Sequence, residues 1–120
     1  MEAPKIFESE YRFCLLLWEH EPLNSTKLVA LCREHLGWSK ATTYTVIRRL
    51  SERGVIQNEN TIVSSLISKE EAQRSRLEEL VKETFEGSMP AFIAAFSRSK
   101  RLSKQDVEQL QSLIDSFQED

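Results

Sequence analysis

The stretch 38-WSKATTYTVIRRLSERG-54 predicts a helix with two unlike faces. Val46, Ile47 and Leu50 recur three or four residues apart, which places them on one apolar side of a helix. A second side is polar and holds Thr42, Thr45, Arg49 and Glu52. One side is therefore suited to packing, and the other is free to contact a partner.

The same stretch is rich in positive charge. It carries Lys40, Arg48, Arg49 and Arg53 against one acid, Glu52. Lysine and arginine neutralise phosphates, and short hydroxyl side chains approach bases or phosphates closely, so this composition favours double-stranded DNA as the partner. The candidate DNA-contacting residues are Ser39, Lys40, Thr42, Thr45, Arg48 and Arg49. An ordinary solvated surface helix would show the same pattern, and this stretch alone does not separate the two readings.

The neighbouring segments favour the DNA interpretation. A helix is predicted from Asn24, as its cap, to about His35, and Gly37 follows in the turn that leads to the basic stretch. Gly54 ends that stretch, and residues 55–67 contain two short β-prone runs around a polar turn at 57–60. Helix, helix and hairpin in this order predict a winged helix-turn-helix.

An additional helix is expected before this motif, from about Glu8 to His20, where Pro22 stops it. Its broad apolar face predicts a core position. The predicted wing contains no lysine or arginine and carries Glu59, so it is poorly equipped to bind phosphate strongly. Most of the DNA contact is therefore assigned to the helix of the basic stretch.

Composition limits the alternatives. The 120 residues suit one compact domain or two small ones, and a net charge of −3 argues against a protein that coats nucleic acid, so DNA contact must come from a local patch. Cys14 and Cys32 lie in apolar helical runs without zinc-ligand spacing, which predicts buried reduced thiols and neither metal nor cofactor. No apolar run is long enough for membrane insertion and no signal-peptide core is present, so a cytoplasmic protein is expected.

The C-terminal part is predicted to be helical. Ser68 and Glu71 form a capping box that opens a long helix to about Glu86, Ser88 caps a shorter helix, and Ser103 with Asp106 begins the last one. The apolar residues at helical spacing, assigned here to dimerisation, are Leu77, Leu80, Val81, Phe85, Phe92, Ile93, Phe96, Val107, Leu110, Ile114 and Phe117. About fifty residues rarely bury so many apolar side chains alone, so a homodimer with a shared core is expected.

The predicted fold is thus mainly α with a small β-hairpin wing. Residues 1–67 are expected to form a winged helix-turn-helix DNA-binding domain, and residues 68–120 a three-helix dimerisation domain.

Several short motifs, taken together in their order, resemble a known family. They are Glu10-Tyr11, Leu17-Trp18, Gly37-Trp38, the set Thr42, Thr45, Arg49, Leu50 and Gly54, and the helix starts at 68–71, 87–88 and 102–103. Their order resembles the penicillinase-repressor (BlaI/MecI) family of bacterial winged-helix transcriptional repressors, over nearly the whole chain.

This resemblance implies a homodimeric repressor of operator DNA, with Thr42, Thr45 and Arg49 on the DNA side. It also implies release by a membrane sensor-protease system that triggers cleavage in the penultimate helix, where Ala95-Phe96 is the matching bond although alanine replaces the expected asparagine. The wing lacks the family's longer basic turn. The cysteine cluster of the copper-sensing branch is also missing, so metal sensing of that kind is not expected.

The predicted function is therefore a dimeric, sequence-specific repressor acting on a two-fold operator. The alternative is a winged-helix module that binds protein and not DNA, which the acidic wing favours. An enzyme is not expected, because no nucleophile-base pair, paired carboxylates or glycine-rich phosphate loop forms an identifiable site.

Overall fold

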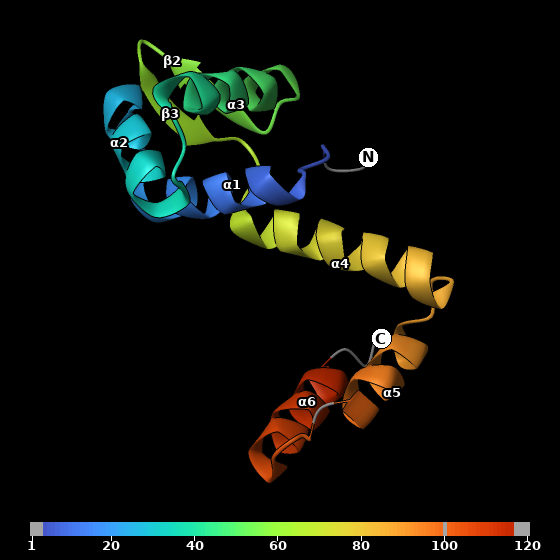
Figure 1. Cartoon of the computed structure of the whole chain (residues 1–120). Helices are drawn as coiled ribbons and strands as arrows, with labels where there is room; N and C mark the ends of the chain where they lie inside the picture. The colour runs from blue at the N-terminus through green and yellow to red at the C-terminus, as the bar shows by residue number, and fades with distance from the viewer. Residues whose placement is uncertain (1–3, 100, 117–120) are drawn as a thin grey trace. The chain divides into compact units, whose positions relative to one another are not determined.

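The computed structural model describes residues 4–99 and 101–116 (Figure 1). Within these residues the helices are α1 (Glu8–His20), α2 (Ser25–Leu36), α3 (Lys40–Glu52), α4 (Lys69–Phe85), α5 (Met89–Ser99) and α6 (Lys104–Ser116). The strands are β1 (Leu23–Asn24), β2 (Ile56–Glu59) and β3 (Ile62–Ser65). The chain divides into two compact units, and the division falls inside α4 between Leu77 and Glu78. The predicted mainly helical fold with a small wing is confirmed.

The helix starts and stops of the N-terminal unit follow from local chemistry. The Asn24 side chain accepts a hydrogen bond from the Thr26 N–H at 2.6 Å and so caps α2. Gly37 ends α2 in the left-handed conformation with φ of 71°, which a residue without a Cβ adopts at little cost. Both predictions are confirmed. Asn24 and Gly37 thus fix where α2 begins and where the turn that leads into α3 begins.

One hydrophobic core unites the helices and the sheet of this unit. Its fully buried side chains come from α1, α2, α3, β2 and β3 and from the segments between them: Phe13, Cys14, Leu17, Leu28, Cys32, Leu50, Val55, Ile56 and Val63. Trp38 stacks on Phe13, with ring centroids 6.0 Å apart. The turn between α2 and α3 is therefore anchored in the core, which fixes where α3 begins.

The wing belongs to a three-stranded antiparallel sheet of order β1-β3-β2. The sequence did not indicate β1, whose Leu23 pairs with Val63. The turn was also predicted too early, at 57–60. Ile56 pairs with Ser65 and Glu59 with Ile62, so the two turn residues are Asn60 and Thr61, with φ of 53° and 66°. Positive φ at both positions matches a tight hairpin turn, which leaves the three preceding polar residues in strand β2.

The first turns of α4 pack as part of the N-terminal unit. Ser68 and Glu71 form the predicted reciprocal cap, at 3.2 and 3.0 Å. Ala72 is buried, and the Trp18 indole N–H donates to the Ile67 carbonyl at 3.0 Å. Arg76 lies over the Tyr11 ring at 4.2 Å. The helical segment that follows the wing is therefore held against α1 before the chain enters the second unit.

The C-terminal unit contains the rest of α4 together with α5 and α6. Ser88 caps α5 through the Ala91 N–H at 3.1 Å, and Ser103 with Asp106 caps α6, as predicted. Phe92 lies edge-on to Phe85 at 5.8 Å, and Val81 is buried. No described residue of α5 or α6 is fully buried. This unit therefore folds locally but leaves most of its apolar stripes open.

Candidate nucleic-acid interface

Helix α3 has one buried side and one exposed side. Thr43, Val46, Ile47 and Leu50 are buried, and the Thr43 hydroxyl donates to the Ser39 carbonyl at 3.1 Å. The predicted apolar stripe is thus confirmed, and Thr43 fits into it because its hydroxyl is satisfied locally. Since four buried residues fix the rotation of the helix, the opposite side is held toward solvent.

The six predicted DNA-contacting residues all lie on α3 or at its cap. Lys40, Thr42, Arg48 and Arg49 are exposed, and Thr45 is half-buried. The Ser39 hydroxyl accepts from the Thr42 N–H at 3.1 Å and donates to the Thr42 hydroxyl at 3.0 Å. Ser39 therefore acts first as the helix cap, and the two hydroxyl groups hold each other in place at the start of α3.

Arg53, counted with the basic charge of this stretch, has a different role. It follows the last residue of α3 and points to α1, where it forms an ion pair with Glu10, which is only 5% exposed. Its guanidinium also donates to the Lys5 carbonyl at 2.8 Å and lies 5.1 Å from the Phe7 ring centre. The positive charge on the solvent-exposed, open side of α3 therefore comes from Lys40, Arg48 and Arg49.

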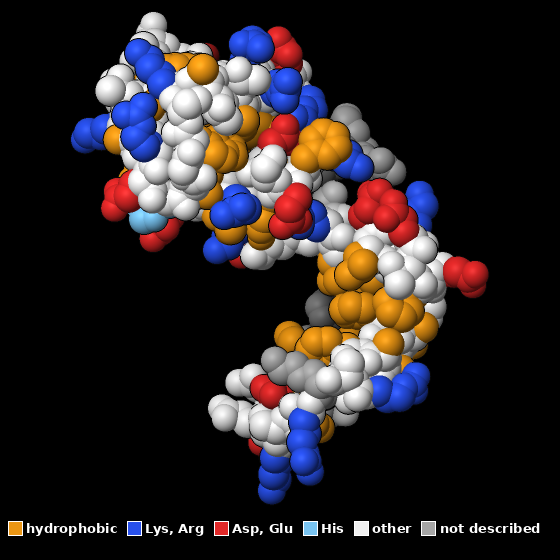
Figure 2. All heavy atoms as spheres, viewed as in Figure 1, with side chains coloured by type: hydrophobic (Ala, Val, Ile, Leu, Met, Phe, Trp, Pro, Cys, Tyr) orange, Lys and Arg blue, Asp and Glu red, His pale blue; other side chains and the backbone are white. Residues whose placement is uncertain are grey.

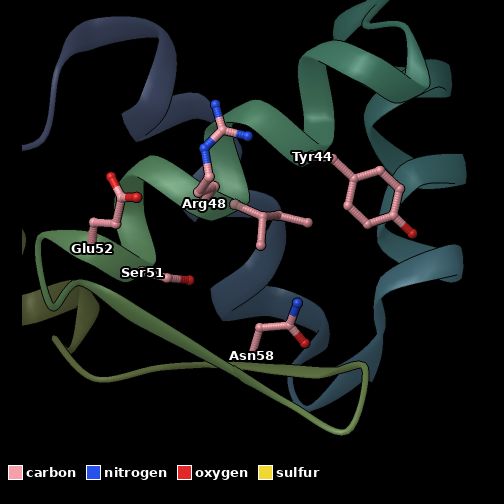
Figure 3. A pocket seen from close by; sticks show the side chains of 6 residues that line it. Tyr44, Arg48, Ser51, Glu52 and Asn58 are labelled. Atoms are coloured by element: carbon pink, nitrogen blue, oxygen red, sulfur yellow. The ribbon is translucent and has the colours of Figure 1, made fainter.

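A shallow, open depression lies between strand β2 and α3 (Figure 3). It is lined by Tyr44, Ile47, Arg48, Ser51, Glu52 and Asn58. Sequence reasoning selected only Arg48 of these as a site residue. The sequence analysis did not select Asn58, because it assigned this residue to the turn. Ser51 could have been selected, because it follows Arg48 by three residues and so lies on the same side of the helix.

Tyr44 connects the two helices of the motif. Its hydroxyl lies 3.3 Å from the Ser25 hydroxyl at the start of α2, within hydrogen-bond range. Ser25 is buried, and its N–H donates to the Thr61 carbonyl in the wing turn at 2.8 Å. The beginning of α2, the middle of α3 and the wing turn are therefore linked by hydrogen bonds, which restrains the exposed side of α3 relative to the wing.

The two cysteines are core residues without site chemistry. Cys14 and Cys32 are buried free thiols. Desolvation raises the pKa of the Cys14 thiol to about 12 and that of Cys32 to about 11. Among residues 4–99 and 101–116, no three His, Cys, Asp or Glu side chains gather into a metal-binding group. Nor does any helix in this part of the chain combine the length and apolar character needed to cross a bilayer.

The residues assigned to dimerisation are mostly open in the single chain. Figure 2 shows apolar side chains gathered over α5 and the end of α4. The exposed ones among the assigned residues are Leu77, Leu80, Ile93, Phe96, Val107 and Ile114. Val81 is buried, Phe85, Phe92 and Leu110 are half-buried, and Phe117 lies outside the described residues. Leu113, a further apolar residue of α6, is 56% exposed.

Comparison with known proteins gives a family match over most of the chain. The family model described as Penicillinase repressor matches residues 6–116. The methicillin resistance regulatory protein MecI of Staphylococcus aureus is 20% identical over 114 residues, which is 92% of this chain and 93% of MecI.

Two solved structures share the fold. Monomeric BlaI of Bacillus licheniformis, solved in solution in complex with the blaP half-operator, gives a TM-score of 0.51 at 20% identity, covering 58% of this chain and 90% of that one. The DNA-binding domain of the repressor BlaI gives 0.50 at 21% identity, covering 59% and 93%. At this identity the likeness establishes the winged helix-turn-helix fold of the N-terminal unit.

Proposed function

The chain belongs to the penicillinase-repressor (BlaI/MecI) family of transcriptional repressors, which are not enzymes, and we propose that it is a homodimer that represses transcription by binding a two-fold operator through α3. In this proposal Lys40, Arg48 and Arg49 neutralise backbone phosphates, whereas Thr42 and Thr45 approach base edges in the major groove. Each subunit contributes one α3 to one half of the operator.

One observation carries the proposal: the open side of α3 holds three cations, and none of the carboxylates that the structure describes forms an ion pair with any of them. The ion pairs among the described residues involve His35, Arg53 and Arg76. Lys40, Arg48 and Arg49 are therefore available to phosphates although the whole chain is acidic. The BlaI structure solved with a half-operator supports DNA as the partner of this fold.

The homodimer is supported by the open apolar stripes of the C-terminal unit. Val107, Leu113 and Ile114 on α6 are each more than half exposed, and Ile93 and Phe96 on α5 are each 42% exposed. Leaving this much apolar surface in water is unfavourable, and a second copy of the same helices provides a matching cover. Dimerisation also places two α3 helices on one DNA duplex.

Selection of bound fragments from a random DNA pool, with the full-length protein, tests the proposal. We expect the recovered duplexes to share a sequence with two-fold symmetry, because a symmetric dimer presents two identical α3 helices. Recovery of no preferred sequence, from protein that sediments as a folded dimer, would contradict it.

A protein-binding winged helix is the second candidate, and the acidic wing favours it. Glu59 lies in β2, and the wing contains no lysine or arginine. A mobility shift at two salt concentrations separates the two functions. Phosphate contacts release counterions, so DNA binding through α3 weakens steeply with salt, whereas a protein-binding module shows no such DNA complex.

Repression is proposed to end by cleavage of the Ala95–Phe96 bond under a membrane sensor-protease system. This bond lies in α5, and Phe96 is part of the open apolar surface. A cut there would separate α6 from the rest of the chain, and the two DNA-binding units would lose the connection that makes binding bivalent. Mass spectrometry of the protein from induced and uninduced host cells tests this. An intact chain with the target gene switched on would exclude cleavage.

A further inference from the structure

The first turns of α4 lie along one side of α1 and are antiparallel to it (Figure 1). At one end, the Trp18 indole N–H donates to the Ile67 carbonyl at 3.0 Å, just before α4 begins. At the other end, the Arg76 guanidinium donates to the Glu8 carboxylate at 3.0 Å and lies over the Tyr11 ring. Together these interactions make up the α1–α4 contact, which attaches α4 to the N-terminal unit at two separate places.

Stacking on Tyr11 is the stronger part of the contact made by Arg76. The Glu8 side chain is 79% exposed, so water screens its ion pair with Arg76, and the pair contributes little by itself. The guanidinium lies 4.2 Å from the Tyr11 ring centre, within the range of a cation–π interaction. The Tyr11 ring is held in turn by an edge-to-face contact with Trp18, with centroids 5.8 Å apart.

The two attachment places are far enough apart to fix a direction. Tyr11 and Trp18 lie on the same side of α1, because seven residues make nearly two turns, and they are about 10 Å apart along the helix axis. Between the two places, the α4 side chain of Ala72 is buried. A helix held at two places this far apart cannot swing about either one. Arg76 therefore restrains the direction in which α4 leaves α1.

The restrained segment ends where the second unit begins. Helix α4 spans Lys69–Phe85 without interruption, and the N-terminal unit ends at Leu77, one residue after Arg76. The chain thus passes from one unit to the other inside a helix and not through a flexible loop. The α1–α4 contact is the last described attachment of α4 within the N-terminal unit.

We propose that Arg76 is a positioning residue for operator binding, which sets the half-site spacing that the dimer accepts by fixing the direction of α4. The proposal rests on the proposed function, since it requires a homodimer on a two-fold operator. Bivalent binding is strongest when the connection between two binding units matches the distance between their sites. Two added base pairs move a half-site by about 7 Å and rotate it by roughly 70°, so a stiff connection binds such an operator poorly.

The test uses the full-length protein and three fluorescent duplexes built from the sequence that the natural protein selects. One duplex carries the whole operator, one carries a single half-site, and one has two base pairs inserted between the half-sites. Arg76→Ala should bind the single half-site with natural affinity, because α3 is unchanged. It should bind the whole operator roughly 3- to 10-fold more weakly, since a looser connection lowers the effective concentration of the second α3. The insertion should weaken its binding less than it weakens binding of the natural protein.

Two matched controls separate the stacking contact from the loss of charge. Arg74→Ala removes the same charge from the same helix. Arg74 is exposed and takes part in none of the ion pairs of the described residues, so this variant should bind all three duplexes normally. Tyr11→Phe keeps the aromatic ring and should also bind normally, whereas Tyr11→Leu removes the ring and should behave like Arg76→Ala.

Hydrogen exchange of the free full-length protein gives a measurement that does not depend on DNA. Arg76→Ala should increase exchange in residues 70–77, because the start of α4 is less firmly held, and should leave exchange in α3 unchanged. Arg74→Ala should change neither segment. Equal exchange in Arg76→Ala and the natural protein would show that Arg76 does not restrain α4, and would overturn the proposal.

The binding measurements can overturn the proposal in two further ways. Equal weakening on the half-site and on the whole operator would show that Arg76→Ala acts through the fold of the N-terminal unit. An unchanged penalty for the two inserted base pairs would show that Arg76 does not set the spacing. If the natural protein itself binds the whole operator no better than the half-site, the proposed two-fold dimer fails instead, so the two failures are distinguishable.

Discussion

The two units of this chain differ in how completely they bury their apolar side chains. In the N-terminal unit Phe13, Leu17 and Leu50 are completely buried within one chain. In the C-terminal unit Leu113 and Ile114 remain 56% and 63% exposed, and among the described residues of this unit Val81 is the one large apolar side chain that is buried. Apolar surface is stabilising only when it is removed from water, so the first unit gains stability from a core of its own, whereas most of the apolar surface of the second contributes little within the single chain.

The largest expected effect comes from separating the units. A fragment of residues 1–77 retains Ala72 and Arg76, which pack or bond within the N-terminal unit, so it should fold as a monomer. Loss of bivalent attachment should weaken operator binding by roughly 10²- to 10⁴-fold relative to the full chain. Sedimentation and anisotropy measure the two properties. A full-length protein that is monomeric at micromolar concentration would show that the C-terminal unit does not form a dimer.

Core truncation should affect the two units differently. Leu50→Ala removes a fully buried side chain and should destabilise the fold by roughly 2–5 kcal/mol. Leu113→Ala removes a side chain that is mostly exposed in the single chain, so the N-terminal unit should keep its stability while the dimer weakens. Chemical denaturation of each variant at several protein concentrations gives both values. A concentration-independent transition for the natural protein and the Leu113 variant would refute the shared core.

Two arginines near the end of α3 should separate stability from binding. Arg53→Ala leaves the buried Glu10 carboxylate without its cation and should cost about 1–3 kcal/mol of folding free energy. Thermal melting measures this loss. If Arg53→Ala melts like the natural protein, the contact to Glu10 is not stabilising, and a structural role for Arg53 is excluded.

Arg49→Ala should show the reverse behaviour. Arg49 is exposed and takes part in none of the ion pairs of the described residues, so melting should be normal. If its guanidinium contacts a phosphate, the slope of log affinity against log salt should shrink by about one unit. Unchanged affinity and slope would remove Arg49 from the interface.

The two buried thiols should make the stability of the N-terminal unit depend on pH. Both have a raised pKa when folded, about 12 for Cys14 and about 11 for Cys32 against 9.0 when exposed. The unfolded chain therefore loses these protons first as pH rises. Stability is fully retained below pH 9 and declines from there toward the folded pKa values, by roughly 1 kcal/mol per thiol at pH 10. Denaturation at pH 8 and pH 10 should show a smaller decline for Cys14→Ala.

Features that depend on residues close together in the chain could be predicted from the amino-acid sequence. Asn24, Ser68, Ser88 and Ser103 cap helices through backbone N–H groups two or three residues away, so their roles are readable from the local sequence. The buried stripe of α3 was equally readable, because its period is a property of the helix.

Contacts between residues far apart in the chain could not be predicted from the sequence and are seen only in the folded structure. Arg53 looked like its basic neighbours until Glu10, 43 residues earlier, proved to be its partner. The pairing of β1 with β3 and the turn at Asn60 and Thr61 follow from long-range strand register, which local propensity does not specify. Asn58 lines the depression between β2 and α3 only because of that register. The sequence thus determined the helices and the basic side of α3, and the fold decided which polar residues remain available at that surface.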